Sequence, residues 1–184
     1  MAVQRDDEGA VQALLNRGFD PNTRDPQGQV GLFLALRTQS MKVADALAAH
    51  RATELDAANQ TAETPLMMAA LRGQLDWCKR LIARGAALDR EGWSPLHYAA
   101  AGPNPEVVGW LLQQRARIEA RSPNGTTPLM MAAGYGSESS VDELLRRGAD
   151  PALRNQQGMT AAAFARSVGR DSLAARLDRA TATR

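Results

Sequence analysis

The sequence predicts an all-α protein built as a solenoid of stacked helix-turn-helix units, and three features of the 184-residue chain predict it. The heptapeptide TPLMMAA occurs twice, and the related phrase SPLHYAA stands between the two copies. The prolines of these copies, Pro65, Pro95 and Pro128, are separated by 30 and 33 residues. A second shared phrase, such as LLRRGADPA, closes each unit. A period near 33 residues is typical of one class of helical repeat protein.

The first phrase predicts the start of the first helix in each unit. Thr64, Ser94 and Thr127 each precede a proline. A hydroxyl side chain accepts a hydrogen bond at a helix N-terminus, and proline is tolerated at the first helical position, where its missing N–H needs no partner. The small residues that follow allow neighbouring helices to approach closely. These small residues are Ala69, Ala70, Ala99, Ala100, Ala132 and Ala133.

The second phrase predicts the second helix and its end. Gly18, Gly85 and Gly148 fall where the helix must end in a left-handed residue, which glycine adopts without steric penalty. Arg115 takes this place in the fourth unit and is a local departure. Pairs of aliphatic residues supply the apolar stripe of the second helix. These pairs are Leu81 with Ile82, Leu111 with Leu112, and Leu144 with Leu145.

These residues resemble the ankyrin-repeat family, whose units carry a threonine-proline-leucine-histidine phrase, a two-helix body and a glycine-alanine-aspartate exit into a β-turn finger. The resemblance covers essentially the whole chain and implies an ankyrin solenoid of about five to six repeats, including atypical capping repeats. The arginine-rich, lysine-poor composition also looks like that of small stand-alone bacterial ankyrin proteins. The expected units are 1–21, 22–57, 58–89, 90–120, 121–152 and 153–184.

Two irregularities interrupt the repeat. The stretch from Gly85 to Pro95 is three residues shorter than its counterparts, which predicts a truncated finger before Trp93. The repeat frame also places Met1 inside the first helix of the opening unit. Either the true start or a cleaved export signal lies upstream of Met1, or the first helix is short. The expected location is therefore the cytoplasm as the chain stands, or the periplasm if an export signal precedes Met1.

Composition limits the classes of partner and chemistry. The formal charge is only +2, and basic residues are interspersed with acidic ones, so nucleic acid is not expected as a partner. Cys78 is the single cysteine, which excludes an intrachain disulfide and metal motifs built on paired cysteines. No apolar run approaches the roughly 20 residues that cross a bilayer. The sequence has no recognisable nucleophile, glycine-loop or metal motif, so we expect no cofactor, no metal and no catalytic residues. We also expect the protein to be a monomer.

Two residues, His97 and Cys78, invite a chemical interpretation and a structural one. His97 completes the phrase SPLH, and the family resemblance implies a hydrogen-bond network that links adjacent repeats. We favour that role over a general base, because a base needs an oriented partner. Met67 and Met130 replace this histidine in the third and fifth units, so those links lose a polar contact. Cys78 is expected to be buried and inert, because a reactive thiol requires exposure and an electropositive setting.

One frame position on the first helices carries large apolar side chains in five of the six expected units. These residues are Leu34, Met68, Tyr98, Met131 and Phe164. We expect this row to belong to the core between repeats, and not to a ligand groove.

The resemblance implies a binding surface on the concave side, formed by finger tips and the exposed sides of the first helices. Trp93, Leu71 and Tyr135 lie at positions that the fold does not require to be apolar, and large side chains at such places are candidate hot spots. For Trp93 the alternative is that it fills space left by the shortened finger, and both interpretations stay open. The candidates are Arg37, Leu71, Arg72, Arg90, Glu91, Trp93, Asn124, Thr126 and Tyr135.

The expected function is that of a non-catalytic protein–protein interaction module, acting as an adaptor or regulator that binds another protein. The alternative is an envelope stress-protective or structural factor of a bacterium, which depends on the resemblance alone. An enzyme with an unrecognised site is the third hypothesis, since no oriented nucleophile, base or metal set is evident.

Overall fold

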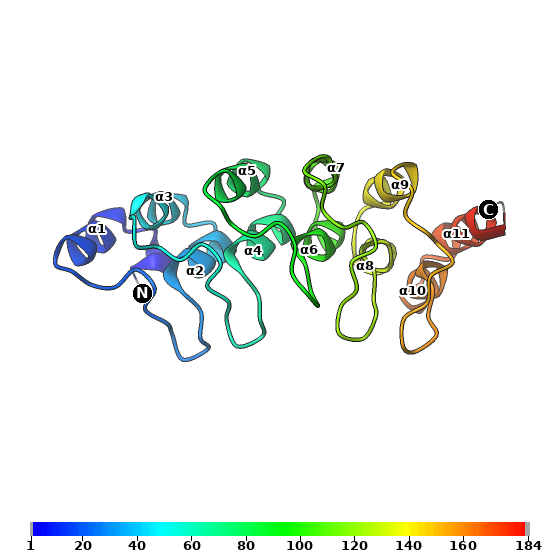
Figure 1. The fold of residues 1–184 in the computed structure, drawn as a ribbon, viewed down its shortest axis with the longest axis horizontal. Helices are drawn as coiled ribbons and strands as arrows, with labels where there is room; N and C mark the ends of the chain where they lie inside the picture. The colour runs from blue at the N-terminus through cyan, green and yellow to red at the C-terminus, as the bar shows by residue number, and fades with distance from the viewer. Residues whose placement is uncertain (1, 183–184) are drawn as a thin grey trace.

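The computed structural model describes residues 2–182, which form a single row of helix pairs (Figure 1). Within this range there are eleven α-helices and one short 3-10 helix, and the only β pairing is an isolated bridge between Arg24 and Val30. The helices are η1 (Val3–Arg5), α1 (Glu8–Asn16), α2 (Gly31–Thr38), α3 (Met41–Ala49), α4 (Pro65–Leu71), α5 (Leu75–Ala83), α6 (Pro95–Ala101), α7 (Pro105–Gln113), α8 (Pro128–Tyr135), α9 (Glu138–Arg146), α10 (Ala161–Ser167) and α11 (Asp171–Ala182). The predicted all-α solenoid is confirmed.

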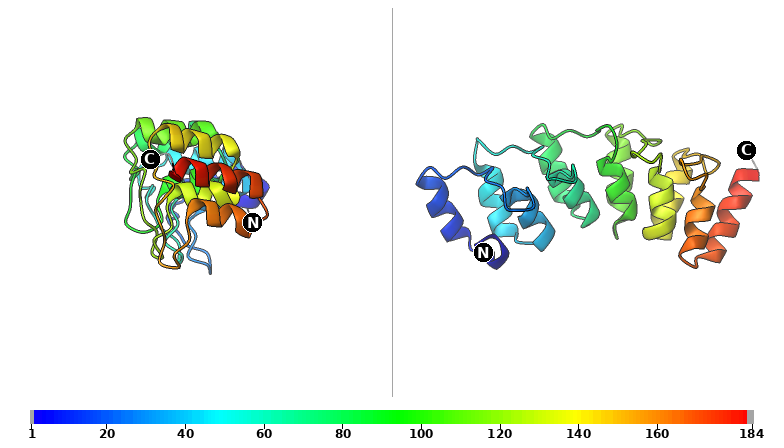
Figure 2. Two further views of the ribbon diagram at one scale, coloured as in Figure 1. Left: turned by 90° about the vertical axis from the view of Figure 1, so that its right-hand side faces the viewer. Right: turned by 90° about the horizontal axis from the view of Figure 1, so that it is seen from below.

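The helices form two layers with loops projecting to one side. The first helices of the pairs, α2, α4, α6, α8 and α10, form one layer, and the second helices α3, α5, α7 and α9 lie above it in Figure 1. The connections between pairs extend as fingers below the first helices, and the view along the row shows these fingers lying beside one another (Figure 2, left). A surface formed by fingers and first helices therefore runs along the array.

The first helices begin as the sequence predicts, with one instructive difference. Thr64 and Thr127 accept hydrogen bonds from the third helical N–H at 3.3 Å, and a proline follows each of them. At Ser94 the hydroxyl instead lies 2.9 Å from Nδ1 of His97, with which it shares a hydrogen bond. The imidazole nitrogen competes for the hydroxyl at that position.

The second helices end in left-handed residues where glycine was expected. Gly18, Gly85 and Gly148 have φ values of 85°, 94° and 99°. Arg115 occupies the same place in the fourth unit and adopts a φ of 72°. A side chain in this conformation costs about 1–2 kcal/mol, because its Cβ approaches the backbone carbonyl.

Neighbouring first helices pack with their backbones in close contact. The alanines predicted to allow this approach are all buried. A Cβ placed on Gly136, at the end of α8, would lie 1.9 Å from the carbonyl oxygen of Ala100 on α6. A Cβ on Gly102 would lie 2.9 Å from the carbonyl oxygen of Leu71. Only glycine fits at Gly136, because the obstacle is backbone that cannot rotate away.

The two ends of the array differ from its middle. At the N-terminal end, η1 precedes α1, and Oδ1 of Asp6 accepts a hydrogen bond from the backbone N–H of Val43 at 2.9 Å. Met1 lies outside the described residues. At the other end, Arg170 Nη1 donates to the carbonyl oxygens of Ala132, Ala133 and Gly136 at 3.2, 3.0 and 2.9 Å, which supplies a donor to the C-terminal carbonyl groups of α8. None of the helices between residues 2 and 182 has the length and apolar character needed to cross a bilayer.

Candidate functional site

The fingers repeat a five-residue turn, and one of them is short. In four fingers the N–H of the first residue donates to the carbonyl of the fifth at 3.0–3.1 Å. The pairs are Asp25 with Gln29, Asn59 with Glu63, Ser122 with Thr126, and Asn155 with Met159. Within the described part of the chain, the segment 90–93 makes no such pair and forms the shortest finger in Figure 1. The predicted truncation before Trp93 is confirmed.

Side chains tie each finger to the next one. Gln60 Nε2 donates to the carbonyl of Pro26 at 3.3 Å, and Gln156 Nε2 donates to that of Pro123 at 3.0 Å. Arg121 Nη1 bridges two units by donating to the carbonyls of Gly125 and Arg154 at 3.1 and 2.8 Å. These bonds restrict the motion of the fingers relative to one another, and a surface fixed in this way binds a ligand at a lower entropic cost.

His97 links the fourth unit to the fifth. Its Nδ1 accepts from the backbone N–H of Ser94 at 3.2 Å, and its Nε2 lies 2.9 Å from the carbonyl oxygen of Thr126. This pattern assigns the hydrogen to Nε2 of a neutral ring, and burial lowers the pKa of His97. At the equivalent positions Met67 and Met130 supply a sulfur acceptor 3.4 Å from the capping residue's N–H but have no donor for the next unit. The predicted role of His97 between repeats is confirmed.

Trp93 stands at the end of the short finger, against His97 and Tyr98. Its ring centroid lies 5.2 Å from that of His97 with an interplanar angle of 77°, and 6.4 Å from that of Tyr98 at 84°. Both contacts are edge-to-face, the arrangement that aromatic quadrupoles favour. The indole is therefore oriented by its neighbours while remaining partly exposed.

A carboxylate from the preceding finger orients Tyr98. The Tyr98 hydroxyl donates to Oε1 of Glu63 at 2.9 Å. Partial burial of Glu63 opposes its ionisation, but hydrogen bonds from Asn59, Thr61 and Tyr98 outweigh this effect and lower the pKa of the carboxyl group. The positive charge of Arg37 adds to the lowering. Burial and the bond to Glu63 raise the pKa of Tyr98, so the hydroxyl remains a donor.

A groove runs across the first helices from α4 to α10. Its first pocket, of about 250 Å³, is lined by Leu71, Trp93, Tyr98, Ala101 and Met131. Its second pocket, of about 550 Å³, shares Trp93 and Met131 with the first, so the two pockets are contiguous. The second pocket is completed by Asn124, Thr126, Tyr135, Gln157, Met159, Phe164 and Ser167.

Five of the nine candidate residues from the sequence lie in this groove. These are Leu71, Trp93, Asn124, Thr126 and Tyr135. Thr126 was expected on the exposed finger surface, and that expectation is wrong. It is only 1% exposed, because the finger turns it toward the body of the repeat and its carbonyl is held by His97.

The four charged candidates lie outside both pockets. Arg37, Arg72 and Glu91 are exposed, and Arg90 is partly buried. Arg90 Nη1 lies 3.4 Å from the carbonyl oxygen of Ala62, and its own carbonyl accepts from Arg117 Nη2 at 2.9 Å. Arg90 therefore contributes to contacts between fingers.

The expectation that the large apolar row on the first helices belongs to the core is confirmed for four of its members, and three of these also line the groove. Met68 is 5% exposed and matches the expectation. Tyr98, Met131 and Phe164 are partly buried, and they both pack against the core and line the groove. The repeat frame contains a signal for one further lining residue, Met159, because it holds the place that Trp93 holds two units earlier.

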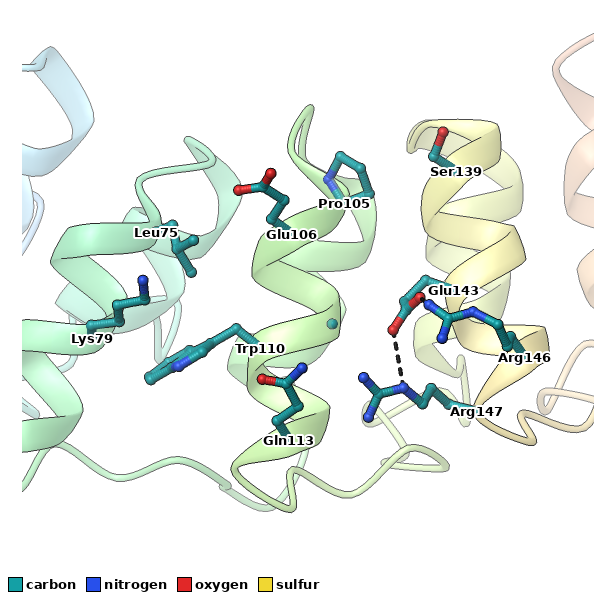
Figure 3. A pocket seen from close by; sticks show the side chains of 11 residues that line it. Leu75, Lys79, Pro105, Glu106, Trp110, Gln113, Ser139, Glu143, Arg146 and Arg147 are labelled. Atoms are coloured by element: carbon teal, nitrogen blue, oxygen red, sulfur yellow. Dashed lines mark ion pairs between the residues drawn. The ribbon is translucent and has the colours of Figure 1, made fainter.

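A second, charged pocket lies on the opposite layer, between α5, α7 and α9 (Figure 3). Its volume is about 580 Å³. Glu143 forms ion pairs with Arg146 and with Arg147 Nε, the latter at 3.0 Å. Gly109 makes room for this carboxylate, since a Cβ there would lie 3.1 Å from Glu143 Oε1. Trp110 extends from α7 toward α5 (Figure 3). Sequence reasoning did not find this pocket.

The chemistry of the remaining candidate, Cys78, is that of a buried thiol. Its side chain is fully buried, and burial raises its pKa to about 12. The predicted burial is confirmed. Across residues 2–182, no three histidine, cysteine, aspartate or glutamate side chains are grouped as metal ligands. Among the hollows of the described residues, the groove is the one that contains candidate residues from the sequence.

A row of stacked helix pairs with projecting fingers defines a solenoid repeat protein. The chain belongs to the ankyrin-repeat family: residues 1–90, 52–122 and 101–177 match the family described as ankyrin repeats (3 copies). Proteins of this family are generally protein–protein interaction modules.

The chain is also similar in sequence to parts of several larger proteins. Human neurogenic locus notch homolog protein 2 is 36% identical over 110 residues, which is 58% of this chain and 4% of that protein. The Xenopus laevis neurogenic locus notch homolog protein 1 is 34% identical over 110 residues. Mouse ankyrin repeat and SAM domain-containing protein 6 is 30% identical over 106 residues, or 55% of this chain and 12% of that protein. The chain spans only a small fraction of each relative.

Proposed function

We propose that this chain is a non-catalytic protein–protein interaction module, an adaptor or regulator that binds its partner through the surface formed by the fingers and first helices. The observation that carries the proposal is the continuous groove from α4 to α10, in which side chains from three fingers and four first helices meet. The groove lies on rigid elements, because hydrogen bonds between units fix its walls.

Several groove residues are larger and more apolar than folding requires. Tyr135 is 64% exposed at the end of α8, so its ring contributes little to the core. Trp93 and Leu71 are partly exposed and face the same pocket. Tryptophan and tyrosine in such positions are the side chains that most often dominate measured binding energies. Their gathering on one face supports partner binding there.

The test is affinity capture with mass spectrometry from a native lysate of the source cells, using variants matched for exposure. Tyr135→Glu places a charge in the groove without removing a buried contact, and Phe19→Glu changes another exposed aromatic residue, 52% exposed, outside the groove. A hot-spot residue contributes 2 kcal/mol or more, so Tyr135→Glu is expected to weaken the complex by about 30-fold.

The wild type and Phe19→Glu are expected to recover the same partner in equal amounts. The double variant Trp93→Ala with Tyr135→Ala is expected to lose it as well, with a lowered melting temperature because Trp93 packs edge-to-face on His97 and Tyr98. Full recovery of the partner by Tyr135→Glu, at a melting temperature equal to that of the wild type, would refute the groove as the binding surface.

A further inference from the structure

The groove is free of charged residues in a chain that is otherwise rich in them. None of its twelve lining residues is Asp, Glu, Lys or Arg, although these types make up 23% of the sequence. The pocket between α5, α7 and α9 has five charged residues among eleven, and the pocket that includes Arg24 has five among ten. The groove thus differs in electrostatic character from these other two hollows.

The first pocket has the size and lining of a site for one large apolar side chain. Its volume of about 250 Å³ is smaller than the 300–1,000 Å³ typical of pockets for drug-sized ligands. Leu71, Trp93 and Met131 form its walls, and Ala101 leaves the space open because its side chain is a single methyl group. The flexible thioether of Met131 adapts to different apolar shapes.

The second pocket adds uncharged hydrogen-bonding groups to an apolar wall. Asn124, Gln157 and Ser167 line it beside Met159 and Phe164. Amide side chains both donate and accept, as peptide groups do. Within residues 2–182 the exposed amide of Gln157 makes no side-chain hydrogen bond of its own. This pocket therefore suits the backbone of a peptide segment that runs on from an anchored side chain.

The charges around the groove do not select one sign. Arg72 directly follows Leu71 in the chain, Glu91 precedes Trp93 by two residues, and Glu63 accepts a hydrogen bond from the Tyr98 hydroxyl. A charged side chain that entered the first pocket would lose its hydration without gaining a counter-ion among the lining residues. The lining therefore disfavours binding of a charged side chain and favours burial of apolar surface.

We infer that the groove binds an uncharged segment of a partner protein that inserts one leucine, methionine or phenylalanine side chain between Leu71, Trp93 and Met131, with its peptide groups along the second pocket. This inference rests on the proposed function, because it assumes that the occupant belongs to a protein partner. It adds the chemistry by which that partner is recognised.

The test uses single amino-acid probes and nuclear magnetic resonance of the full chain with ¹³C-methyl methionine. The probes are the N-acetyl amides of leucine, phenylalanine, aspartate and lysine. The leucine and phenylalanine probes are expected to shift the Met131 methyl signal with saturation in the millimolar range. The aspartate and lysine probes are expected to bind at least tenfold more weakly.

Two variants with the same introduced side chain separate the groove from the opposite face. Ala101→Met fills the first pocket at a partly exposed position and is expected to reduce the affinity for the leucine probe at least tenfold. Gln113→Met introduces the same side chain into the charged pocket on α7 and is expected to leave that affinity unchanged. Melting temperatures verify that both variants fold.

Equal shifts from charged and apolar probes, or an affinity that Ala101→Met does not change, would overturn the inference. A preference for the aspartate probe would instead indicate an acidic segment held by Arg72. Self-association of the wild type that Ala101→Met abolishes would assign the groove to a second copy of the chain.

If Tyr135→Glu loses the partner while apolar probes fail to bind, the inference fails and the proposed function stands. If the leucine probe binds but Tyr135→Glu keeps the partner, the proposed function fails.

Discussion

The buried imidazole of His97 makes the stability of this protein depend on pH in a defined direction. Its Nδ1 accepts from Ser94 N–H, so a proton on Nδ1 would place two donors face to face. Burial lowers its pKa from the ordinary value of 6.5. Below pH 6.5 the unfolded chain therefore binds a proton that the folded chain does not. The free energy of unfolding falls with falling pH by up to about 1.4 kcal/mol per pH unit, until the folded-state pKa is reached.

The perturbation is His97→Met, which installs the residue that Met67 and Met130 provide in the neighbouring units. Near pH 7.5 this variant is expected to be less stable by about 1–3 kcal/mol, because the buried Thr126 carbonyl loses its donor. Between pH 6.5 and 5 the wild type is expected to lose this advantage at up to about 1.4 kcal/mol per unit. The two stability curves therefore converge as the solution becomes more acidic.

The assay is urea unfolding followed by tryptophan fluorescence at pH 7.5, 6.5, 5.5 and 5.0. Both proteins carry His50→Gln, so that they differ only in the presence of His97 and contain no other histidine. An equal slope of the urea dependence in both proteins shows that the midpoints report stability. A stability difference that stays constant with pH, or one that grows in favour of the wild type on acidification, would contradict the assignment of a neutral, hydrogen-bonded His97.

Three further predictions address other positions. Gly136→Ala is expected to destabilise the fold by about 3 kcal/mol or more in urea unfolding, because its Cβ would overlap the Ala100 carbonyl. A loss of stability below about 0.5 kcal/mol, as for an ordinary surface substitution, would contradict this packing. Arg115→Gly is expected to raise the free energy of unfolding by about 0.5–1 kcal/mol, because relief of the left-handed backbone strain outweighs the added entropy of the unfolded chain. Gly85→Ala is expected to lower the free energy of unfolding by a similar amount. Equal stability of Arg115→Gly and the wild type would count against strain at Arg115. Cys78 is expected to resist a thiol-specific disulfide reagent in the native protein and react once urea unfolds it, and rapid native labelling contradicts its burial.

Local features were predictable because they depend on residues close together in the chain. The Thr-Pro starts at Thr64 and Thr127 place a hydroxyl three residues before the N–H that it accepts from. Gly18, Gly85 and Gly148 end their helices through a backbone conformation that glycine alone adopts freely. The repeat period converts these local signals into a solenoid, since one unit cannot bury its own apolar stripe. The short finger was also predictable, because the stretch from Gly85 to Pro95 is three residues shorter than its counterparts.

The groove could not be predicted from local sequence patterns, because it is formed by contacts between units about 30 residues apart in the chain. Met68 and Met131 share a frame position, yet one is in the core and the other also lines the groove. Thr126 and Asn124 share a finger, yet only Asn124 is exposed. Exposure at these positions is decided by what the adjacent unit places against them, such as the hydrogen bond from His97 to the Thr126 carbonyl. The chain's own residues thus specify the repeat, whereas the packing of neighbouring repeats selects the side chains that remain available to a partner.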